Sequence, residues 1–305
     1  MRPARPAVVA LAVVLGVAGC GPPPERVDTV ALDDDVVTVA SFDFPESRLL
    51  AEIYGQALEA AGFDVDLHLG AGPRELVQPA LSRGLVEFVP EYAGTAVEFL
   101  GEGPRPTSDP ATTYAALQRL LRDEPVVALA PAPAQDTNAV VVTARLADDL
   151  GLATISDLRD VAGDLVFGGP PECPGRPFCL GGLQSSYGLW FEDFMPLDVG
   201  GPLTHQALAD GHIDVALLFS TDPRLAAGGD LVVLADDRSL QPAENVTPLV
   251  RAEVVARGGD ELVAAANAVS ARLTTEGLLA LNAAVRAGRP EARVAAGWLQ
   301  VQGLA

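Results

Sequence analysis

The chain has 305 residues, a formal net charge of −21 and a sequence pI of about 4.3. This acidity argues against nucleic acid as a partner, because nucleic-acid phosphates require a basic protein face, and it makes an anionic membrane surface equally unattractive to the folded body. The length is enough for one large domain or two modest ones, each with its own core, and we expect two lobes.

The N-terminal residues have the pattern of a lipoprotein signal. Two arginines precede an apolar run over residues 7–17, and Ala-Gly-Cys follows at 18–20. Such a run is too short to span a bilayer as a permanent helix, which needs about 20 residues, and small residues before a cysteine suit a signal peptidase. We therefore expect a signal peptide over residues 1–19, a lipid on Cys20 that anchors the chain outside the cytoplasm, and a flexible tether over residues 20–35. The alternative, a structural N-terminal helix, is opposed by the helix-breaking Gly and Pro residues that follow.

Beyond the tether, strand and helix patterns alternate, which is typical of an α/β fold with a largely parallel sheet. Glycines at 62 and 84 end the first two helices, as helix C-termini favour. The strands expected in this part are 36–41, 63–69, 85–89 and 125–129, and the helices are 45–61, 73–83, 93–100 and 111–122.

A change of pattern at residues 130–143 predicts a crossing between two lobes. Residues 130–134 alternate Ala and Pro, and residues 138–143 form a β-branched run suited to an interlobe strand. A second series of elements follows, and a return crossing is expected over 231–250. The series comprises helices at 155–161, 182–191 and 204–210 and strands at 165–168 and 213–219, and helices at 260–287 and 290–298 end the chain. We thus expect lobe one over 36–137 and 243–305, lobe two over 138–242, and a hinge with two interlobe crossings.

Cys173 and Cys179 are the remaining cysteines, and five residues separate them. In an exported chain a local disulfide is the natural interpretation, and it would close a small loop around Arg176. Two free thiols or a metal pair are the alternatives. No further Cys or His lies nearby to complete a zinc site, so no metal is expected.

Enzyme motifs are absent from the sequence. We find no nucleophile elbow, phosphate loop, dinucleotide glycine fingerprint or histidine zinc motif. His68, His205 and His212 have no neighbouring Cys or Ser to activate, so surface or packing roles are expected for them. The sequence therefore predicts a protein that is not an enzyme and has no cofactor.

Open α/β sheets bind ligands at their strand ends, and several aromatic and hydroxyl side chains occur there. Aromatic faces gathered in a cleft attract a quaternary ammonium group by about 0.5 to 2 kcal/mol each. The alternative is that these aromatic residues belong to the hydrophobic core. For Phe42 and Phe219, a core position and a ligand contact fit the sequence equally well. The candidates at strand ends are Phe42, Phe44, Tyr92, Thr95, Phe219 and Thr221.

Five stretches of the chain resemble the glycine betaine, choline and carnitine binding proteins of osmoprotectant ABC importers. They are SFDFPESRLLAEIYGQALEA at 41–60, PEYAGT at 90–95, DTN at 136–138, YGL at 187–189 and GHIDVALLFSTDP at 211–223. The resemblance implies a two-lobed, type II periplasmic-binding-protein fold that closes on its ligand like a hinged clamp. It also implies an ABC permease and its ATPase as partners of a monomeric binding protein.

The resemblance carries a set of ligand residues onto this chain, with departures from the family pattern. Members that bind betaines usually have a box of four tyrosines, of which only Tyr92 is present here. Phe42 stands where members often have a lysine for a ligand carboxylate, and Arg176 is an alternative partner for such a group. The residues implied are Phe42, Ser47, Tyr92, Asp136, Asn138, Arg176, Phe219, Thr221 and Glu244.

Three hypotheses follow. The leading one is capture of a compatible solute, in particular a quaternary ammonium compound, for an ABC importer. The second keeps the fold but replaces the ligand with a larger aromatic or neutral polar molecule, because the tyrosine box is depleted. The third, a lipoprotein enzyme or adhesive structural protein, is opposed by the missing nucleophile and base.

Overall fold

The computed structural model of the chain describes residues 35–101, 105–226 and 229–305. The expected signal peptide, the lipidation site Cys20 and the expected tether up to residue 34 lie outside these residues. Residues 35–305 group into a single unit that contains two five-stranded sheets. Across the described residues, every helix falls short of the length or the apolarity that crossing a bilayer requires.

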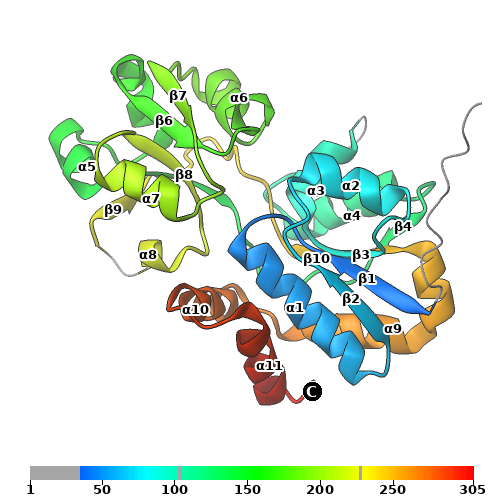
Figure 1. Cartoon of the computed structure of the whole chain (residues 1–305). Coiled ribbons are helices and arrows are strands. Elements are labelled where there is room, and N and C mark those ends of the chain that lie inside the picture. Colours follow the sequence, from blue (N-terminus) through cyan, green and yellow to red (C-terminus); the bar gives the residue numbers. More distant parts are fainter. Residues whose placement is uncertain (1–34, 102–104, 227–228) are drawn as a thin grey trace, which may run out of the picture. The chain divides into compact units, whose positions relative to one another are not determined.

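The first sheet and the helices packed on it form lobe one (Figure 1). Its strands are β1 (Val36–Ala40), β2 (Asp64–His68), β3 (Phe88–Tyr92), β4 (Val126–Ala128) and β10 (Val246–Arg251). They lie in the order β2-β1-β3-β10-β4, with β1 parallel to β2 and β3, and β10 antiparallel to β3 and β4. Its helices are α1 (Pro45–Ala60), α2 (Arg74–Ser82), α3 (Ala93–Leu100), α4 (Pro110–Leu120), α9 (Ala252–Arg272), α10 (Thr275–Arg286) and α11 (Glu291–Gln302). Figure 1 shows α1 and α9 against one face of the sheet and α2, α3 and α4 against the other.

The second sheet and its helices form lobe two. Its strands are β5 (Asn138–Thr143), β6 (Val166–Gly169), β7 (Asp193–Pro196), β8 (Val215–Phe219) and β9 (Leu231–Val233). They lie in the order β7-β6-β8-β5-β9, with β6 parallel to β7 and β8, and β5 antiparallel to β8 and β9. The helices are α5 (Ala144–Leu150), α6 (Leu180–Gly182), α7 (Pro202–Ala209) and α8 (Pro223–Ala226), with short helical turns η1 (Ile155–Asp160), η2 (Ala162–Asp164), η3 (Cys173–Gly175) and η4 (Leu183–Tyr187).

The chain passes from the first sheet to the second between β4 and β5 and returns between β9 and β10. The two crossing segments run next to each other. An antiparallel bridge joins Gln135 to Asn245, and the Asp136 amide donates to the Glu244 carbonyl over 3.2 Å. Two adjacent crossings of this kind are the arrangement expected of a hinge.

Helix α1 shows why the local predictions for lobe one succeed. Pro45 lies at its first turn, where a missing N–H is harmless, and its apolar residues recur at helical spacing. Leu49, Leu50 and Ile53 have no solvent exposure and pack against the sheet. The Tyr54 hydroxyl, also buried, lies 2.9 Å from the Ser270 hydroxyl of α9, which connects the two helices on this face.

Some predicted boundaries are wrong. The third strand was expected over 85–89 but occupies Phe88–Tyr92, because β10, distant in sequence, pairs with it residue by residue. The helix expected over 182–191 ends at Tyr187, since Gly188 adopts a left-handed φ of 71°. The single helix expected over 260–287 is two helices, and the Thr274 side chain caps the second. Helix α5 and strand β7 were not predicted.

Candidate functional site

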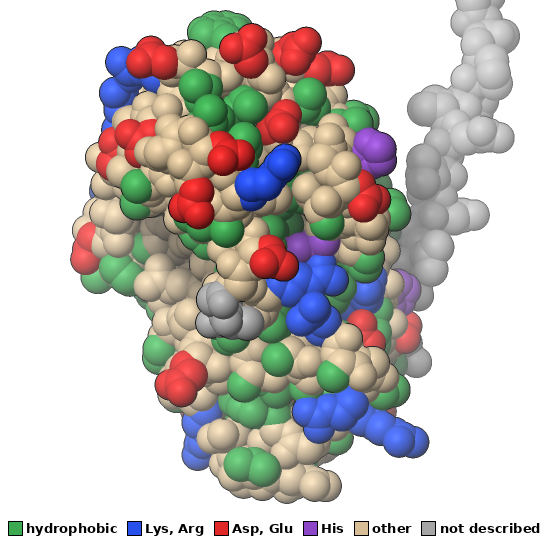
Figure 2. Space-filling view, turned by 90° about the vertical axis from the view of Figure 1, so that its left-hand side faces the viewer, with side chains coloured by type: hydrophobic (Ala, Val, Ile, Leu, Met, Phe, Trp, Pro, Cys, Tyr) green, Lys and Arg blue, Asp and Glu red, His purple; other side chains and the backbone are tan. Residues whose placement is uncertain are grey.

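A cavity of about 360 Å³ has residues of both lobes in its walls. Eight of the predicted ligand residues line it: Phe44, Tyr92, Thr95, Asp136, Asn138, Arg176, Phe219 and Glu244. An adjoining cavity of about 380 Å³ shares Phe44, Asp136 and Phe219 with it and has Thr221 in its wall. Figure 2 shows one face of the molecule, where acidic side chains are spread over the upper part and basic ones gather beside a hollow near the middle.

Aromatic rings from both lobes meet in the main cavity. Phe44, which precedes α1, stacks on Tyr92 of β3 with ring centroids 6.1 Å apart and on Phe219 of β8 with centroids 5.4 Å apart. Phe42 stacks on Phe44 from behind at 6.1 Å and does not line the cavity. Phe178, which sequence reasoning missed, is a further aromatic residue of the wall. The cavity thus offers several π faces, which suit a cation or an apolar methyl group.

Glu46 is a buried carboxylate that sequence reasoning did not identify. It is 6% exposed, and three donors from separate elements surround it. The Tyr92 hydroxyl donates to its Oε1 over 2.7 Å, and Thr221 Oγ1 and Asn282 Nδ2 each donate to Oε2 over 2.5 Å. Burial and the charge of Glu46 raise the pKa of Tyr92 well above its usual value, so Tyr92 is a neutral phenol. In the sequence, Glu46 has only the pattern of an acidic first-turn helix residue.

Asp136 and Glu244 lie side by side on the two crossing segments. Asp136 is 5% exposed and accepts hydrogen bonds from the Ser220 hydroxyl at 3.1 Å and the Thr221 amide at 3.0 Å. Burial, with the charge of Glu46 added, raises the pKa of Asp136 well above its usual range.

Glu244 is equally buried, with 3% exposure. It accepts from the Thr95 amide at 3.0 Å and from the Thr95 hydroxyl. Burial raises the pKa of Glu244 to about 7. Among the described residues, neither Asp136 nor Glu244 has an Arg or His partner at ion-pair distance.

Arg74, a third residue missed from sequence, belongs to a closed ion pair. Its Nε and an Nη donate to the two carboxylate oxygens of Glu91 over 2.6 and 2.9 Å, and both side chains are buried. Glu91 also accepts from the Tyr92 amide at 2.6 Å. The guanidinium carbon lies 4.8 Å from the centre of the Phe42 ring. The charges of Arg74 and Glu91 offset each other, so Arg74 is not a free cation in the cavity wall.

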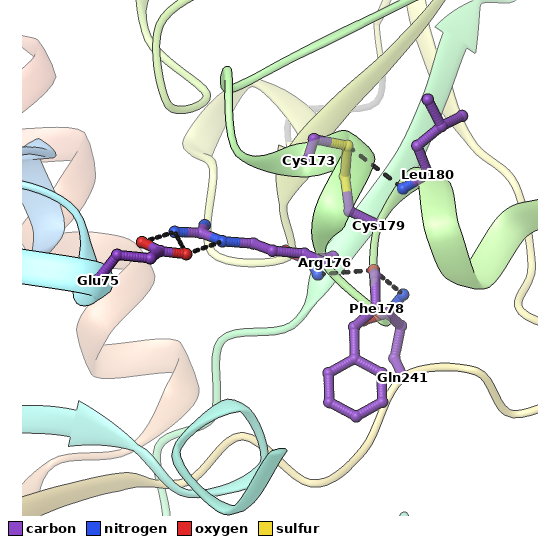
Figure 3. The surroundings of a disulfide bond; sticks show 8 residues. Glu75, Cys173, Arg176, Phe178, Cys179, Leu180 and Gln241 are labelled. Carbon is purple, nitrogen blue, oxygen red and sulfur yellow. Dashed lines mark hydrogen bonds and ion pairs between the residues drawn. A yellow bond between two sulfur atoms is a disulfide. The ribbon is translucent and has the colours of Figure 1, made fainter. Parts of the chain in front are cut away.

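The predicted disulfide is present, and it shapes the loop that carries Arg176 (Figure 3). Cys173 and Cys179 are joined with their Cα atoms 5.2 Å apart. Asn138 and Gln241 each donate a side-chain amide to the Phe178 carbonyl at 3.0 Å. Asn138, which was predicted to contact ligand, lines the cavity and anchors this loop.

Two predicted residues, Ser47 and Phe42, lie outside both cavities for clear packing reasons. Ser47 is fully buried, and its Oγ accepts from the Phe42 amide at 2.8 Å, so it fixes the start of α1. Phe42 is 3% exposed in the core of lobe one. Sequence reasoning also missed Glu75, Glu98 and Phe99 of the cavity wall. Within the described part of the chain, no cluster of three or more His, Cys, Asp or Glu side chains is arranged to hold a metal ion.

Comparisons with known proteins agree with this architecture. The family model described as the substrate binding domain of ABC-type glycine betaine transport systems matches residues 35–301. The chain is 30% identical to a glycine-betaine-binding protein of Pseudomonas aeruginosa over 82% of each chain. It superposes on a crystal structure of a glycine betaine/carnitine/choline ABC transporter with a TM-score of 0.68 and 26% identity, covering 88% of this chain and 99% of the other. Lactococcal OpuAC in its closed form with glycine betaine, 17% identical over 88% of this chain and 96% of its own, has the same fold with a TM-score of 0.62.

These matches confirm the expected α/β fold of the type II periplasmic binding proteins. Substrate-binding proteins of ABC importers lie outside the cytoplasm, where they bind small molecules and work with an ABC transporter. This chain belongs to the family of substrate-binding domains of ABC-type glycine betaine transport systems.

Proposed function

We propose that this chain captures a quaternary ammonium osmolyte in the cavity between its lobes and delivers it to an ABC permease and its ATPase. The observation that carries the proposal is the pairing of stacked aromatic rings with two buried carboxylates, Asp136 and Glu244, that have no cationic partner at ion-pair distance within the described part of the chain. A trimethylammonium group would lie against Phe44, Tyr92 and Phe219, each ring contributing about 0.5 to 2 kcal/mol. Its charge would offset the penalty of ionising Asp136 and Glu244 away from water.

The mechanism is closure and involves no catalytic step. Tyr92 belongs to lobe one, Phe219 belongs to lobe two, and Asp136 and Glu244 lie on the segments that connect the lobes. A ligand that contacts all of them binds more tightly to the closed arrangement than to an open one. Binding therefore shifts the population toward the closed form that a permease recognises.

Calorimetry with matched ligands tests the proposal. Choline is compared with its neutral isostere 3,3-dimethylbutan-1-ol, in which carbon replaces the ammonium nitrogen. We expect choline to bind at least tenfold more tightly. Only the charged ligand is attracted to the aromatic rings by cation-π interaction and to the carboxylates by Coulomb interaction. Equal affinities would show that a neutral apolar ligand suits the site, and absence of binding by choline, glycine betaine and carnitine would reject the proposal.

A variant pair separates the cavity charge from general acidity. Asp136→Asn should weaken choline binding by roughly tenfold or more, because it removes a buried charge in the cavity wall. Asp237→Asn is the matched control, since Asp237 is a lobe-two carboxylate whose only described partner is the Ser156 amide at the exposed surface. Similar losses in both variants would contradict a local role for Asp136.

We further propose that a lipid on Cys20 anchors the mature chain to the membrane as a monomer, with lobe one over 36–137 and 243–305 and lobe two over 138–242. Tethering near the permease would raise the effective concentration of the binding protein there. Cell fractionation tests the anchor: Cys20→Ala should move the protein from the membrane fraction to the soluble one. Retention of this variant on the membrane would contradict it.

A further inference from the structure

Glu75 of lobe one and Arg176 of lobe two form an ion pair across the wall of the main cavity (Figure 3). Arg176 donates from Nε to Glu75 Oε1 over 3.2 Å, and one terminal nitrogen donates to Oε1 over 3.2 Å and to Oε2 over 2.9 Å. Two neighbouring nitrogens of the guanidinium thus hold both oxygens of one carboxylate. This is the fork geometry in which arginine binds a carboxylate most specifically.

The loop that carries Arg176 is held in place on several sides. The disulfide between Cys173 and Cys179 closes it, and the Arg176 amide donates to the Cys173 carbonyl over 3.1 Å. The Phe178 carbonyl, two residues further on, accepts from Asn138 and Gln241. The guanidinium is therefore presented to the cavity by a constrained backbone, and its partner Glu75 lies in the first turn of α2.

Arg74 and Arg176 are the basic residues among the described lining of the cavity, and each already holds a carboxylate. Arg74 is bound to Glu91 in the core, whereas the Glu75 side chain is 42% exposed and the Arg176 side chain 27% exposed. The buried acids Asp136 and Glu244 lie in the same wall. A ligand carboxylate in this cavity would meet these like charges, and to take the Nε–Nη edge of Arg176 it would have to displace Glu75.

We propose that Glu75 is a specificity-determining residue that competes with a ligand carboxylate for Arg176, so that the site favours quaternary ammonium compounds without a carboxylate. This inference rests on the proposed function. It predicts that the site binds choline-like ligands more tightly than glycine betaine or carnitine. The ammonium group of every such ligand would occupy the aromatic and acidic part of the cavity. Only the ligands that carry a carboxylate, such as glycine betaine and carnitine, would need Arg176.

The test measures the ratio of the dissociation constants of glycine betaine and choline by calorimetry. The parent protein should bind choline more tightly. In Glu75→Gln, Arg176 is free to hold a ligand carboxylate, so the ratio of the two affinities should shift by about tenfold toward glycine betaine. The ratio is the informative quantity, because any loosening of the lobes by loss of the ion pair affects both ligands alike.

Two further variants make the assignment specific. Adding Arg176→Gln to Glu75→Gln should abolish the gain for glycine betaine, because the gain depends on the guanidinium. Glu253→Gln is the matched control, since Glu253 is also a first-turn glutamate of lobe one paired with an arginine, Arg251, but lies outside the cavity lining. Its ratio should equal that of the parent.

The outcomes separate the two proposals. If choline and glycine betaine bind but Glu75→Gln leaves their ratio unchanged, or the double variant keeps the gain, this inference is wrong and the proposed function stands. If the parent prefers glycine betaine, the inference is also overturned. If the parent protein binds neither of these compounds nor carnitine, the proposed function fails and the inference fails with it.

Discussion

Replacing Glu244 with glutamine should stabilise the ligand-free protein in a pH-dependent way. Burial raises the pKa of Glu244 from 4.5 to about 7 in the folded chain, so the folded state binds more protons than the unfolded state between these values. Stability contributed by this carboxyl is therefore present below pH 4.5 and declines as the pH rises to 7. A pKa difference of one unit corresponds to about 1.4 kcal/mol. The free energy of unfolding at pH 8 is therefore about 3 kcal/mol lower than it would be if Glu244 kept its ordinary pKa.

Glutamine removes the ionisation and keeps an oxygen that accepts from the Thr95 amide. We expect Glu244→Gln to gain up to about 3 kcal/mol at pH 8 and almost nothing at pH 4, as measured by urea denaturation at both pH values. The same variant should bind choline more weakly at pH 8, because the site loses a negative charge. Stability and function would then change in opposite directions.

Glu91→Gln provides the contrast. Glu91 is as buried as Glu244 but holds the Arg74 guanidinium, so its neutralisation leaves a buried cation without its partner and should destabilise by about 3 to 5 kcal/mol. The reasoning is refuted if Glu244→Gln gains nothing at pH 8, or if it gains equally at pH 4 and pH 8.

Three further perturbations test other parts of the structure. Replacing Cys173 and Cys179 with serine opens a short loop and should cost about 2 kcal/mol in urea denaturation, whereas an unchanged midpoint would show that the loop is ordered without the bond. Tyr92→Phe removes the donor to buried Glu46 and should cost about 1 to 2 kcal/mol while leaving choline affinity within a few fold, since the ring remains; a large affinity loss in calorimetry would instead assign the hydroxyl to the ligand. Gly94→Ala would place a Cβ 2.5 Å from a proline Cγ and should lower the melting temperature by several degrees, and a neutral effect would contradict the close packing of α3 on the crossing segment.

Local patterns predicted much of the fold. The apolar spacing of α1 and the β-branched run of β5 identify their elements because both are properties of neighbouring residues. The shift of β3 to Phe88–Tyr92 depends on pairing with β10, which lies more than a hundred residues away. Such pairing leaves no local signal.

Eight of the eleven predicted ligand residues line the main cavity, and the reasons why other lining residues were missed are physical. Aromatic and hydroxyl residues at strand ends were identified because sheet topology brings strand ends together, whereas Asp136 and Glu244 were predicted from the family resemblance. Glu46 and Glu75 were missed because each has the pattern of a first-turn helix acid, and only tertiary contacts distinguish them. Phe42 and Phe44 were both expected to contact ligand, and only Phe44 lines the cavity, because Phe42 packs in the core behind it.

The placement of Asp136 and Glu244 on the adjacent crossing segments has a mechanical consequence. Where the residues that contact a ligand and the segments that connect two lobes are separate, ligand binding must be coupled to the connecting segments through other parts of the protein. On the proposed function, the carboxylates that would sense ligand charge lie on the connecting segments themselves, so a change in their ionisation would act directly on the backbone that links the lobes. Anyone who re-engineers the ligand charge preference at these two positions should therefore expect the rates of opening and closing to change as well.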